Sequence, residues 1–203
     1  MTEIRVYVEG DPKLRRGFHE FFKDVRKQAG VRRIKFQCIP CGAEPVRDFC
    51  CALKSNREAL NVLLLDNDGQ LSFEGLTQRN DWKPPREVSE DKVHWMVQIM
   101  ESWFLADVET LREYYGPEFA SDRLPAYPNV EDAPKTDVER GLKEATRRTS
   151  KRQYHKTAHA PDILAKLRPD LVRARAPHCR RLFDTLLARL AAISAARAPS
   201  GAR

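Results

Sequence analysis

The sequence lacks any long run of apolar residues. No stretch of its 203 residues approaches the roughly 18 consecutive apolar residues that span a membrane. The charged start and apolar middle of a signal peptide are also missing from the first ten residues, MTEIRVYVEG. We therefore expect a cytoplasmic protein without a membrane partner.

A nucleotide-binding loop of the form G-x-x-x-x-G-K-[ST] is also absent. Any ATP-driven step must therefore come from a partner protein. The sequence contains no internal repeat and no extended low-complexity tract, and its 41% hydrophobic and 32% charged residues are ordinary for a globular protein. A repeat array and a globally disordered chain are thereby excluded.

Cysteine is present in an odd number, which argues against a disulfide framework. The five cysteines are Cys38, Cys41, Cys50, Cys51 and Cys179. Cys38 and Cys41 have the spacing of a zinc ligand pair, but the adjacent Cys50 and Cys51 are poorly arranged to close a tetrahedral site. Reduced thiols are thus favoured, and a zinc site is the alternative.

Charge is distributed unevenly along the chain, whose net charge is +7. Residues 1–139 contain 20 basic and 25 acidic residues, whereas residues 140–203 contain 16 basic and 4 acidic residues. The C-terminal part, at +12, favours contact with polyanions, because its cations release counterions from them. Nucleic acid is the favoured partner, and an acidic protein is the alternative.

Segments with the composition of β-strands alternate with segments of helical periodicity. The run at 61–65 is continuously apolar, which is typical of a strand buried on both faces in a parallel sheet. We therefore predict an α/β fold: a doubly wound parallel sheet of about four strands with a C-terminal helical extension. Strands are predicted at 3–8, 34–39, 61–65 and 93–100, and helices around 18–25, 46–53, 101–115, 137–149, 161–167 and 177–196.

Turn-forming residues divide the chain. Gly116 and Pro117 close the helix that follows the fourth predicted strand, and prolines and acidic residues come next. We predict a core at 1–116, a basic, mostly helical extension packed on this core at 117–196, and a frayed tail at 197–203.

Acidic residues follow two of the predicted strands. Glu9 comes directly after the first strand, and Asp66 and Asp68 come after the third. Ligands bind beyond the carboxyl ends of strands in open parallel sheets. Two aspartates spaced i and i+2 can address one hard cation, and Mg²⁺, with Mn²⁺ as a substitute, suits their oxygens better than zinc does. The alternative is a solvated Asp-Asn-Asp-Gly turn with local hydrogen bonds.

The chain thus has a strand ending in Glu-Gly, then βα units, then an apolar strand ending in Asp-x-Asp. This order resembles the TOPRIM domain of topoisomerases, primases and OLD-type nucleases. In this resemblance Glu9 matches the family's glutamate, a candidate acid/base or metal ligand. Asp66 and Asp68 match its metal-binding aspartates. The resemblance implies a magnesium-dependent nuclease that acts on DNA or RNA.

Further motifs extend the likeness over most of the chain. They are Val8-Glu9-Gly10, Leu65-Asp66-Asn67-Asp68, MESWFLAD at 100–107, Tyr154-His155-Lys156 and His159-Ala160. With them the chain resembles a group of small, stand-alone TOPRIM-like prokaryotic proteins of unknown function, of the type called domain of unknown function 4276. Such proteins are often found in defence neighbourhoods beside an ATPase, which implies an anti-phage effector that works with an ATPase partner.

Glu101 lies where the fourth predicted strand meets the next helix. It is a further candidate metal ligand, because this junction is at the same sheet edge as the other acids. Its alternative role is a favourable charge at a helix N-terminus. Trp103, Phe104 and Leu105 are interpreted as core residues rather than as a base-stacking platform, and Asp107 is placed on the exposed helix face.

A basic segment at 151–159 supplies candidate nucleic-acid contacts. They are Lys151, Arg152, His155, Lys156 and His159. Lys156 is the favoured contact to the charge that develops on a scissile phosphoryl group. A solvated basic face is the alternative, and a zinc pair of the two histidines is disfavoured.

These residues together favour a magnesium-dependent nuclease in which Asp66, Asp68 and Glu9 hold the metal. The alternative is a non-catalytic subunit whose acidic pocket and basic segment bind nucleic acid or an ATPase partner. Phosphoryl or nucleotidyl transfer is a more distant third. Basic side chains contact backbone charge, which DNA and RNA share, so the sequence does not separate these two substrates.

Overall fold

A parallel sheet of four strands forms the centre of the computed structural model, which describes residues 3–67 and 72–197. The strands are β1 (Glu3–Val8), β2 (Lys35–Pro40), β3 (Leu60–Asn67) and β4 (Val93–Val97). Their order across the sheet is β2-β1-β3-β4, and every neighbouring pair is parallel. The predicted parallel sheet is thus confirmed, although β4 ends at Val97 rather than at residue 100.

Strand β3 shows why the central strands are apolar. Val62 and Leu64 face one layer of helices, and Leu63 and Leu65 face the other. Each of these side chains is at most 1% exposed. Successive side chains of a strand point to opposite faces, so a strand covered on both sides is apolar at every position.

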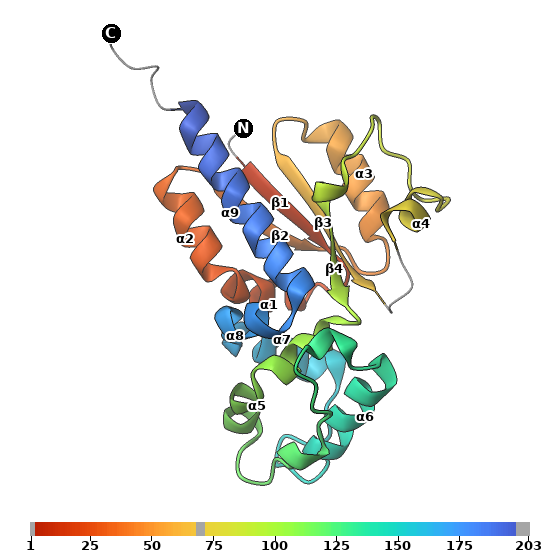
Figure 1. The fold of residues 1–203 in the computed structure, drawn as a ribbon, viewed down its shortest axis with the longest axis vertical. Coiled ribbons are helices and arrows are strands. Elements are labelled where there is room, and N and C mark those ends of the chain that lie inside the picture. Colours follow the sequence, from red (N-terminus) through yellow and green to blue (C-terminus); the bar gives the residue numbers. More distant parts are fainter. Residues whose placement is uncertain (1–2, 68–71, 198–203) are drawn as a thin grey trace.

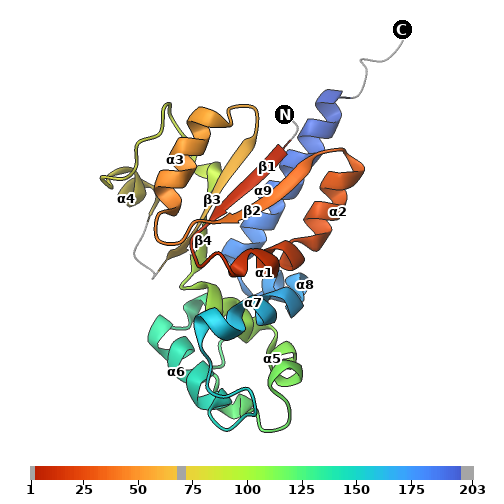
Figure 2. The same cartoon turned by 180° about the vertical axis from the view of Figure 1, so that it is seen from behind.

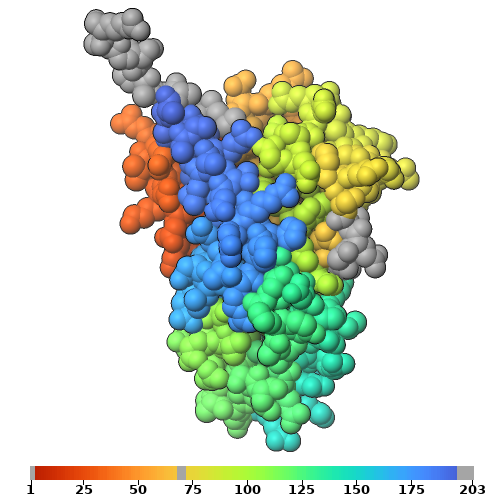
Figure 3. All heavy atoms as spheres, in the orientation of Figure 1, coloured from red at the N-terminus to blue at the C-terminus, as the bar shows by residue number. Residues whose placement is uncertain are grey.

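One layer of helices covers the first face of the sheet. Its members are α1 (Leu14–Phe21), α2 (Lys23–Val31) and α9 (Pro177–Arg197). The ring centroids of Phe22 and Phe183 lie 5.1 Å apart, and these rings join the junction of α1 and α2 to α9 across the buried interface. Figures 1 and 3 show α2 and α9 side by side on the surface.

The opposite face is covered by α3 (Pro45–Ser55) and by the short helix α4 (Phe73–Thr77). Phe49 of α3 packs against Tyr7 of β1 and against Trp82, with ring centroids 6.3 Å and 6.1 Å away. Figure 2 shows α3 and α2 on opposite sides of the sheet. Helices on both faces confirm the predicted doubly wound α/β arrangement.

Helical elements also gather beyond the carboxyl ends of the strands, at the bottom of Figure 1. They are η2 (Met100–Ala106), α5 (Val108–Tyr115), η3 (Ser121–Arg123), η4 (Val130–Asp132), α6 (Lys135–Thr146) and α7 (Lys156–Lys166), followed by α8 (Pro169–Arg175). We call the part from η2 to α7 the helical lobe. One buried cluster contains residues of both the sheet and the lobe. The domain boundary expected at residue 116 stays a prediction.

Helix α7 ties the lobe to the sheet layer because it packs closely along α1. Gly17 of α1 makes this approach possible, since a Cβ atom there would lie 2.9 Å from the Pro161 carbonyl oxygen and 3.0 Å from Leu164.

The helix predicted at 161–167 begins five residues earlier, at Lys156, and continues through Pro161. Helix α8 is not predicted by the periodicity.

The helix predicted at 101–115 is wrong in its first half. Met100–Ala106 forms a 3₁₀ helix, and α5 begins only after Asp107. Asp107 caps α5 by accepting a hydrogen bond from the Thr110 amide, and it is 1% exposed rather than on a solvated face. Its carboxylate also accepts hydrogen bonds from Arg168, a partner 61 residues away that local periodicity cannot indicate. Trp103, Phe104 and Leu105 are buried, as predicted.

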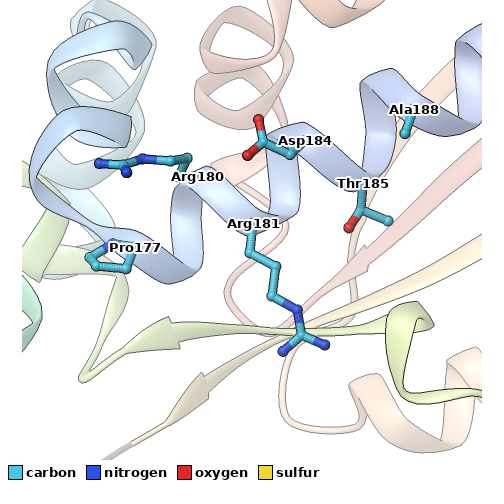
Figure 4. Close-up of a pocket in the computed structure, with 6 residues that line it drawn as sticks. All are labelled: Pro177, Arg180, Arg181, Asp184, Thr185 and Ala188. Carbon is cyan, nitrogen blue, oxygen red and sulfur yellow. The ribbon is translucent and has the colours of Figure 1, made fainter.

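Helix α9 lies against β4 and covers His94. Figure 4 shows Arg181 of α9 pointing toward β4 from a shallow groove of about 450 Å³, and its guanidinium lies 3.5 Å from Glu90. His94 is 1% exposed, and its Nε2 donates to the Asp91 carbonyl oxygen at 3.2 Å. Within residues 3–67 and 72–197, no helix, α9 included, has the length and apolar character to cross a membrane.

The burial of His94 makes the free energy of unfolding depend on pH. Burial and the nearby charge of Arg181 lower the pKa of His94 to about 4. An unfolded histidine titrates near 6.5, so the unfolded state takes up the proton first, and the fold loses stability as pH falls from about 6.5 to 4. We expect His94 to account for a loss of about 2–3 kcal/mol in the free energy of unfolding between pH 7.5 and 4.5.

Urea unfolding of His94→Gln at both pH values measures this effect, because glutamine keeps a donor for Asp91 without a titrating ring. The variant should lose less stability on acidification than the parent protein. His155→Gln, at an exposed histidine, is the control and should retain the parent's pH dependence. Equal pH dependence in the His94 variant and the parent would contradict the assignment.

Candidate functional site

The acidic residues after β1 and within β3 meet at one point of the sheet edge. Chain connections run from β1 to β2 on one side and continue from β3 to β4 on the other, so the topological switch point lies between β1 and β3. A crevice forms outside the carboxyl ends of the strands at such a point. Glu9 follows β1, and Asp66 is the penultimate residue of β3.

Glycine positions the loop that carries Glu9. Gly10 has φ of +138°, a conformation that other residues rarely adopt, and a Cβ atom there would lie 2.6 Å from Leu14. Gly10 and Gly42 bond to each other through both backbone amides, at 3.2 Å and 2.9 Å. This pairing joins the loops after β1 and β2. The Glu9 amide in turn donates to the Leu64 carbonyl oxygen of β3 at 2.9 Å.

The carboxylates of Glu9 and Asp66 are held beside each other by backbone amides. Glu9 Oε2 accepts a hydrogen bond from the Asp66 amide at 3.2 Å. Asp66 Oδ1 accepts one from the Met100 amide at 2.9 Å. The neighbouring positions of β1 and β3 therefore bring the two predicted acids together.

Lys156 joins Asp66 to Glu101. Its Nζ lies 3.4 Å from Asp66 Oδ2 and 3.3 Å from Glu101 Oε2. The other Glu101 oxygen, Oε1, accepts a hydrogen bond from the Tyr154 hydroxyl at 2.9 Å. Glu101 is thus a buried carboxylate, with 3% of its side chain exposed, that has a partner on each oxygen. We call Glu9, Asp66, Glu101, Tyr154 and Lys156 the acidic site.

The surroundings change the proton affinities of this site. Burial raises the pKa of Asp66 to about 7, with the negative charges of Glu101 and Glu9 adding to the effect and Lys156 opposing it. Burial favours the neutral form of Lys156, but the charges of Glu101 and Asp66 outweigh it and raise the pKa of Lys156. Burial and Glu101 raise the pKa of Tyr154, which stays a hydrogen-bond donor.

Tyr154 is held in place by the end of α6. Its amide donates to the Thr146 hydroxyl at 2.6 Å, and that hydroxyl donates to the Leu142 carbonyl oxygen at 2.7 Å. Its ring packs on Phe104 with centroids 6.2 Å apart. The sequence offers little sign of this role beyond the position of Tyr154 two residues before Lys156.

The other cations of the segment 151–159 do not enter the acidic site. Lys151 Nζ lies 4.7 Å from the centre of the Tyr114 ring, and Arg152 adopts a left-handed turn with φ of 67°. The His155 amide donates to His159 Nδ1 at 2.9 Å. Burial lowers the pKa of His159, so its ring is neutral at pH 7. Of the cations at 151–159, all of them described, Lys156 is the one that pairs with Asp66 and Glu101.

Carboxylates and thiols are among the side chains of this fold that could bind a metal ion. Asp68 lies outside the described residues. Within residues 3–67 and 72–197, no three histidine, cysteine, aspartate or glutamate side chains are grouped closely enough to hold a metal ion. The cysteines are all free thiols. Glu9, Asp66 and Glu101 supply hard carboxylate oxygens, which are the donors that Mg²⁺ prefers.

Fold and site define an α/β protein whose parallel sheet holds a cluster of acids and one lysine at its switch point. A family model described as a domain of unknown function (DUF4276) matches residues 11–187. The chain therefore belongs to this family. Comparisons with curated proteins and with solved structures gave no significant match.

The ion pairs of Lys156 predict a pH-dependent loss of stability on its removal. In Lys156→Met, Asp66 and Glu101 lose their shared cation and repel each other when both are ionised. We expect the free energy of unfolding to fall by about 1–3 kcal/mol at pH 8. The loss at pH 6 should be smaller, because a carboxyl with a pKa of about 7 is then largely protonated.

Urea unfolding at the two pH values tests this expectation. Lys151→Met removes an exposed ammonium group from the same segment and is the matched control. It should cost less than about 1 kcal/mol, with no difference between pH 6 and 8. An equal loss in Lys156→Met at both pH values would show that Asp66 does not titrate against Lys156.

Proposed function

We propose that this protein is a magnesium-dependent nuclease that hydrolyses phosphodiester bonds of DNA or RNA. The observation that supports the proposal is the convergence of Glu9, Asp66, Glu101 and Lys156 at the switch point of the sheet. Carboxylates and a cation from distant parts of the chain are the groups that phosphoryl chemistry uses. The order of Glu9 and Asp66 along the chain also supports the resemblance to TOPRIM domains.

The carboxylate donors fit a divalent cation in their chemistry, although the described groups alone are not gathered closely enough to hold one. Lys156 pairs with both Asp66 and Glu101, so these two ionised carboxylates exceed the charge of their shared ammonium group. That excess contributes to the raised pKa of Asp66. Asp66 and Glu9, joined by Asp68, would hold Mg²⁺ or Mn²⁺, with Glu101 as a further ligand. The bound ion would supply an acidified water molecule and shield the phosphate charge.

The remaining residues bind and orient the substrate or move protons. Lys156 is suited to contact a phosphate oxygen, because its side chain is 44% exposed while its ammonium group stays beside the carboxylates. Glu9 is suited to accept or return a proton if it is not a metal ligand. Tyr154 positions Glu101 by donating to one of its oxygens.

A role in anti-phage defence with an ATPase partner is part of the proposal. It follows from the resemblance to stand-alone TOPRIM-like proteins of defence neighbourhoods. Copurification of the two proteins would test this part independently of cleavage.

A second candidate function is a non-catalytic subunit that binds nucleic acid or an ATPase. One observation favours it: the Lys156 ammonium group already forms ion pairs with both carboxylates that it joins. An internal cation of this kind makes an ion pair that is stable without metal. Activity with and without divalent cations separates this candidate from the nuclease.

Substitution of the acids should separate their roles in cleavage. Asp66→Asn should abolish cleavage of labelled DNA or RNA in Mg²⁺ or Mn²⁺, because the amide removes a metal-binding charge. Glu9→Gln should retain Mg²⁺ affinity and slow cleavage by about 10²- to 10⁴-fold if Glu9 transfers a proton. If Glu9 is a ligand, its variant should lose Mg²⁺ affinity as well.

Gel assays in Mg²⁺, Mn²⁺ and EDTA, together with isothermal titration of Mg²⁺, measure both properties. Asp184→Asn, at an exposed acid of α9, is the matched control and should cleave as the parent protein does. Cleavage that persists in Asp66→Asn would overturn the site assignment. Binding without cleavage by the parent protein in either metal would support the non-catalytic candidate.

The pKa of Asp66 also predicts how Mg²⁺ affinity depends on pH. A proton and a metal ion compete for the same carboxylate, and the pKa of Asp66 is about 7 without metal. Because ionisation rises from about one tenth at pH 6 to about nine tenths at pH 8, we expect Mg²⁺ affinity to rise by about tenfold. Calorimetric titration at both pH values tests this, and Asp66→Asn should show no such rise.

A further inference from the structure

A basic pocket lies on α2 and the edge strand β2, on the face that Figure 2 shows with α2 beside β2. It has a volume of about 330 Å³ and is lined by Lys23, Arg26, Lys27 and Phe36. Three of these residues are cations, and the fourth is an aromatic ring that packs on Phe22 with centroids 5.8 Å apart. No acidic residue lines the pocket.

The chain around this pocket is strongly basic. Residues 13–35 contain nine lysines and arginines but only two acids, Glu20 and Asp24. Their net charge of +7 equals that of the whole protein. The average over residues 1–139 hides this segment, because the rest of that part is acidic.

The three cations of the pocket lack direct ion-pair partners in the described part of the chain, and the Glu20 carboxylate acts on Arg26 and Lys23 only at longer range. Among the described residues, no ion pair involves Lys23, Arg26 or Lys27, whereas Arg16 pairs with Asp162 and Lys35 with Glu3. The Arg26 guanidinium donates to the His19 carbonyl oxygen at 3.1 Å. Positive charge gathered in a pocket without a directly paired counterion is available for an external anion.

Spacing along α2 arranges these cations in one group. Lys23, Arg26 and Lys27 are related as i, i+3 and i+4, which places their Cβ atoms about 5–6 Å apart on one helix face. Such a group can contact successive phosphates of a nucleic-acid backbone, and the adjacent Phe36 ring offers an apolar floor. We propose that this pocket is a second nucleic-acid contact, which holds the polynucleotide away from the acidic site.

A phosphate backbone suits this surface better than an acidic protein does. Protein interfaces have an apolar core surrounded by polar residues. Among the described residues the only exposed large hydrophobic side chain is Val31, at 79% exposure, which ends α2 beside the pocket, and one such residue does not make an apolar core. Contact through cations alone is typical of sequence-independent binding to nucleic acid.

The pocket and the acidic site lie at different ends of the sheet. Phe36 is in register with Ile4, five residues before Glu9, which corresponds to about 16 Å along β1 at 3.3 Å per residue. A duplex rises about 34 Å in ten base pairs, so the two sites are separated by about five base pairs. A substrate must therefore extend at least this far from the scissile bond to reach both.

Salt-dependent binding by the full-length protein tests the proposal. Binding is measured in EDTA on labelled 20-base-pair DNA and on 20-nucleotide RNA, between 50 and 200 mM salt. In the triple variant Lys23→Gln, Arg26→Gln, Lys27→Gln, we expect the slope of log affinity against log salt to flatten by about 2–3. An oligonucleotide of four nucleotides is too short to span the two sites, so its cleavage in Mg²⁺ should be unchanged.

The matched control is Lys54→Gln, Arg57→Gln, Lys83→Gln, which removes the same charge from exposed positions on the α3 side of the sheet. Thermal unfolding confirms that both variants are folded. Equal slopes in the two triple variants overturn the proposal. Displacement of bound DNA by poly-glutamate at equal charge concentration also overturns it, and identifies an acidic protein as the occupant.

The inference rests on the proposed function only for its link to the acidic site. Binding in EDTA does not require cleavage, so an inactive parent protein would leave the second contact testable. Conversely, an unchanged salt slope would leave the magnesium-dependent nuclease intact. The two failures are therefore distinguishable.

Discussion

The ammonium group of Lys156 connects three parts of the chain that are far apart in sequence. It lies between Asp66 on β3 and Glu101 on η2, while Lys156 itself begins α7. Removing carboxylates from water is costly unless a partner replaces the lost solvation. The position of the helical lobe on the sheet and the geometry of the acidic site therefore depend on the same ion pairs. Tyr154 completes this arrangement by satisfying the remaining oxygen of Glu101.

The parts of the fold that follow local rules were predictable from the sequence. Apolar runs and their turn residues indicated the strands, and the ends of β1 and β3 placed Glu9 and Asp66 at one edge. The roles that could not be predicted belong to residues whose partners are far away in the sequence. Asp107 looks like a solvated helix residue until Arg168 is brought to it by the fold. Tyr154 has no local pattern that would link it to Glu101, because their contact spans 53 residues.

The distribution of charge over the folded protein is also hidden from an average along the sequence. An average over residues 1–139 is acidic, yet the fold collects the basic part of that region on α1, α2 and the start of β2. The acids of the same region gather partly at the strand ends. Ionic screening acts over about 8 Å at physiological salt, so sites about 16 Å apart keep separate local potentials. The proposed second contact and the acidic site can thus attract a polyanion and a metal ion independently.

The order of residues along the chain has a consequence for protein synthesis. A ribosome releases Glu9, Asp66 and Glu101 well before Lys156, which lies 55 residues after the last of these acids. A nascent chain that ends before α7 therefore has Asp66 and Glu101 without the ammonium group that pairs with both. The acidic site becomes complete only when α7 has emerged and packed along α1. Copies that end before α7 thus lack an assembled centre, and any activity of the site requires a chain that extends through this helix.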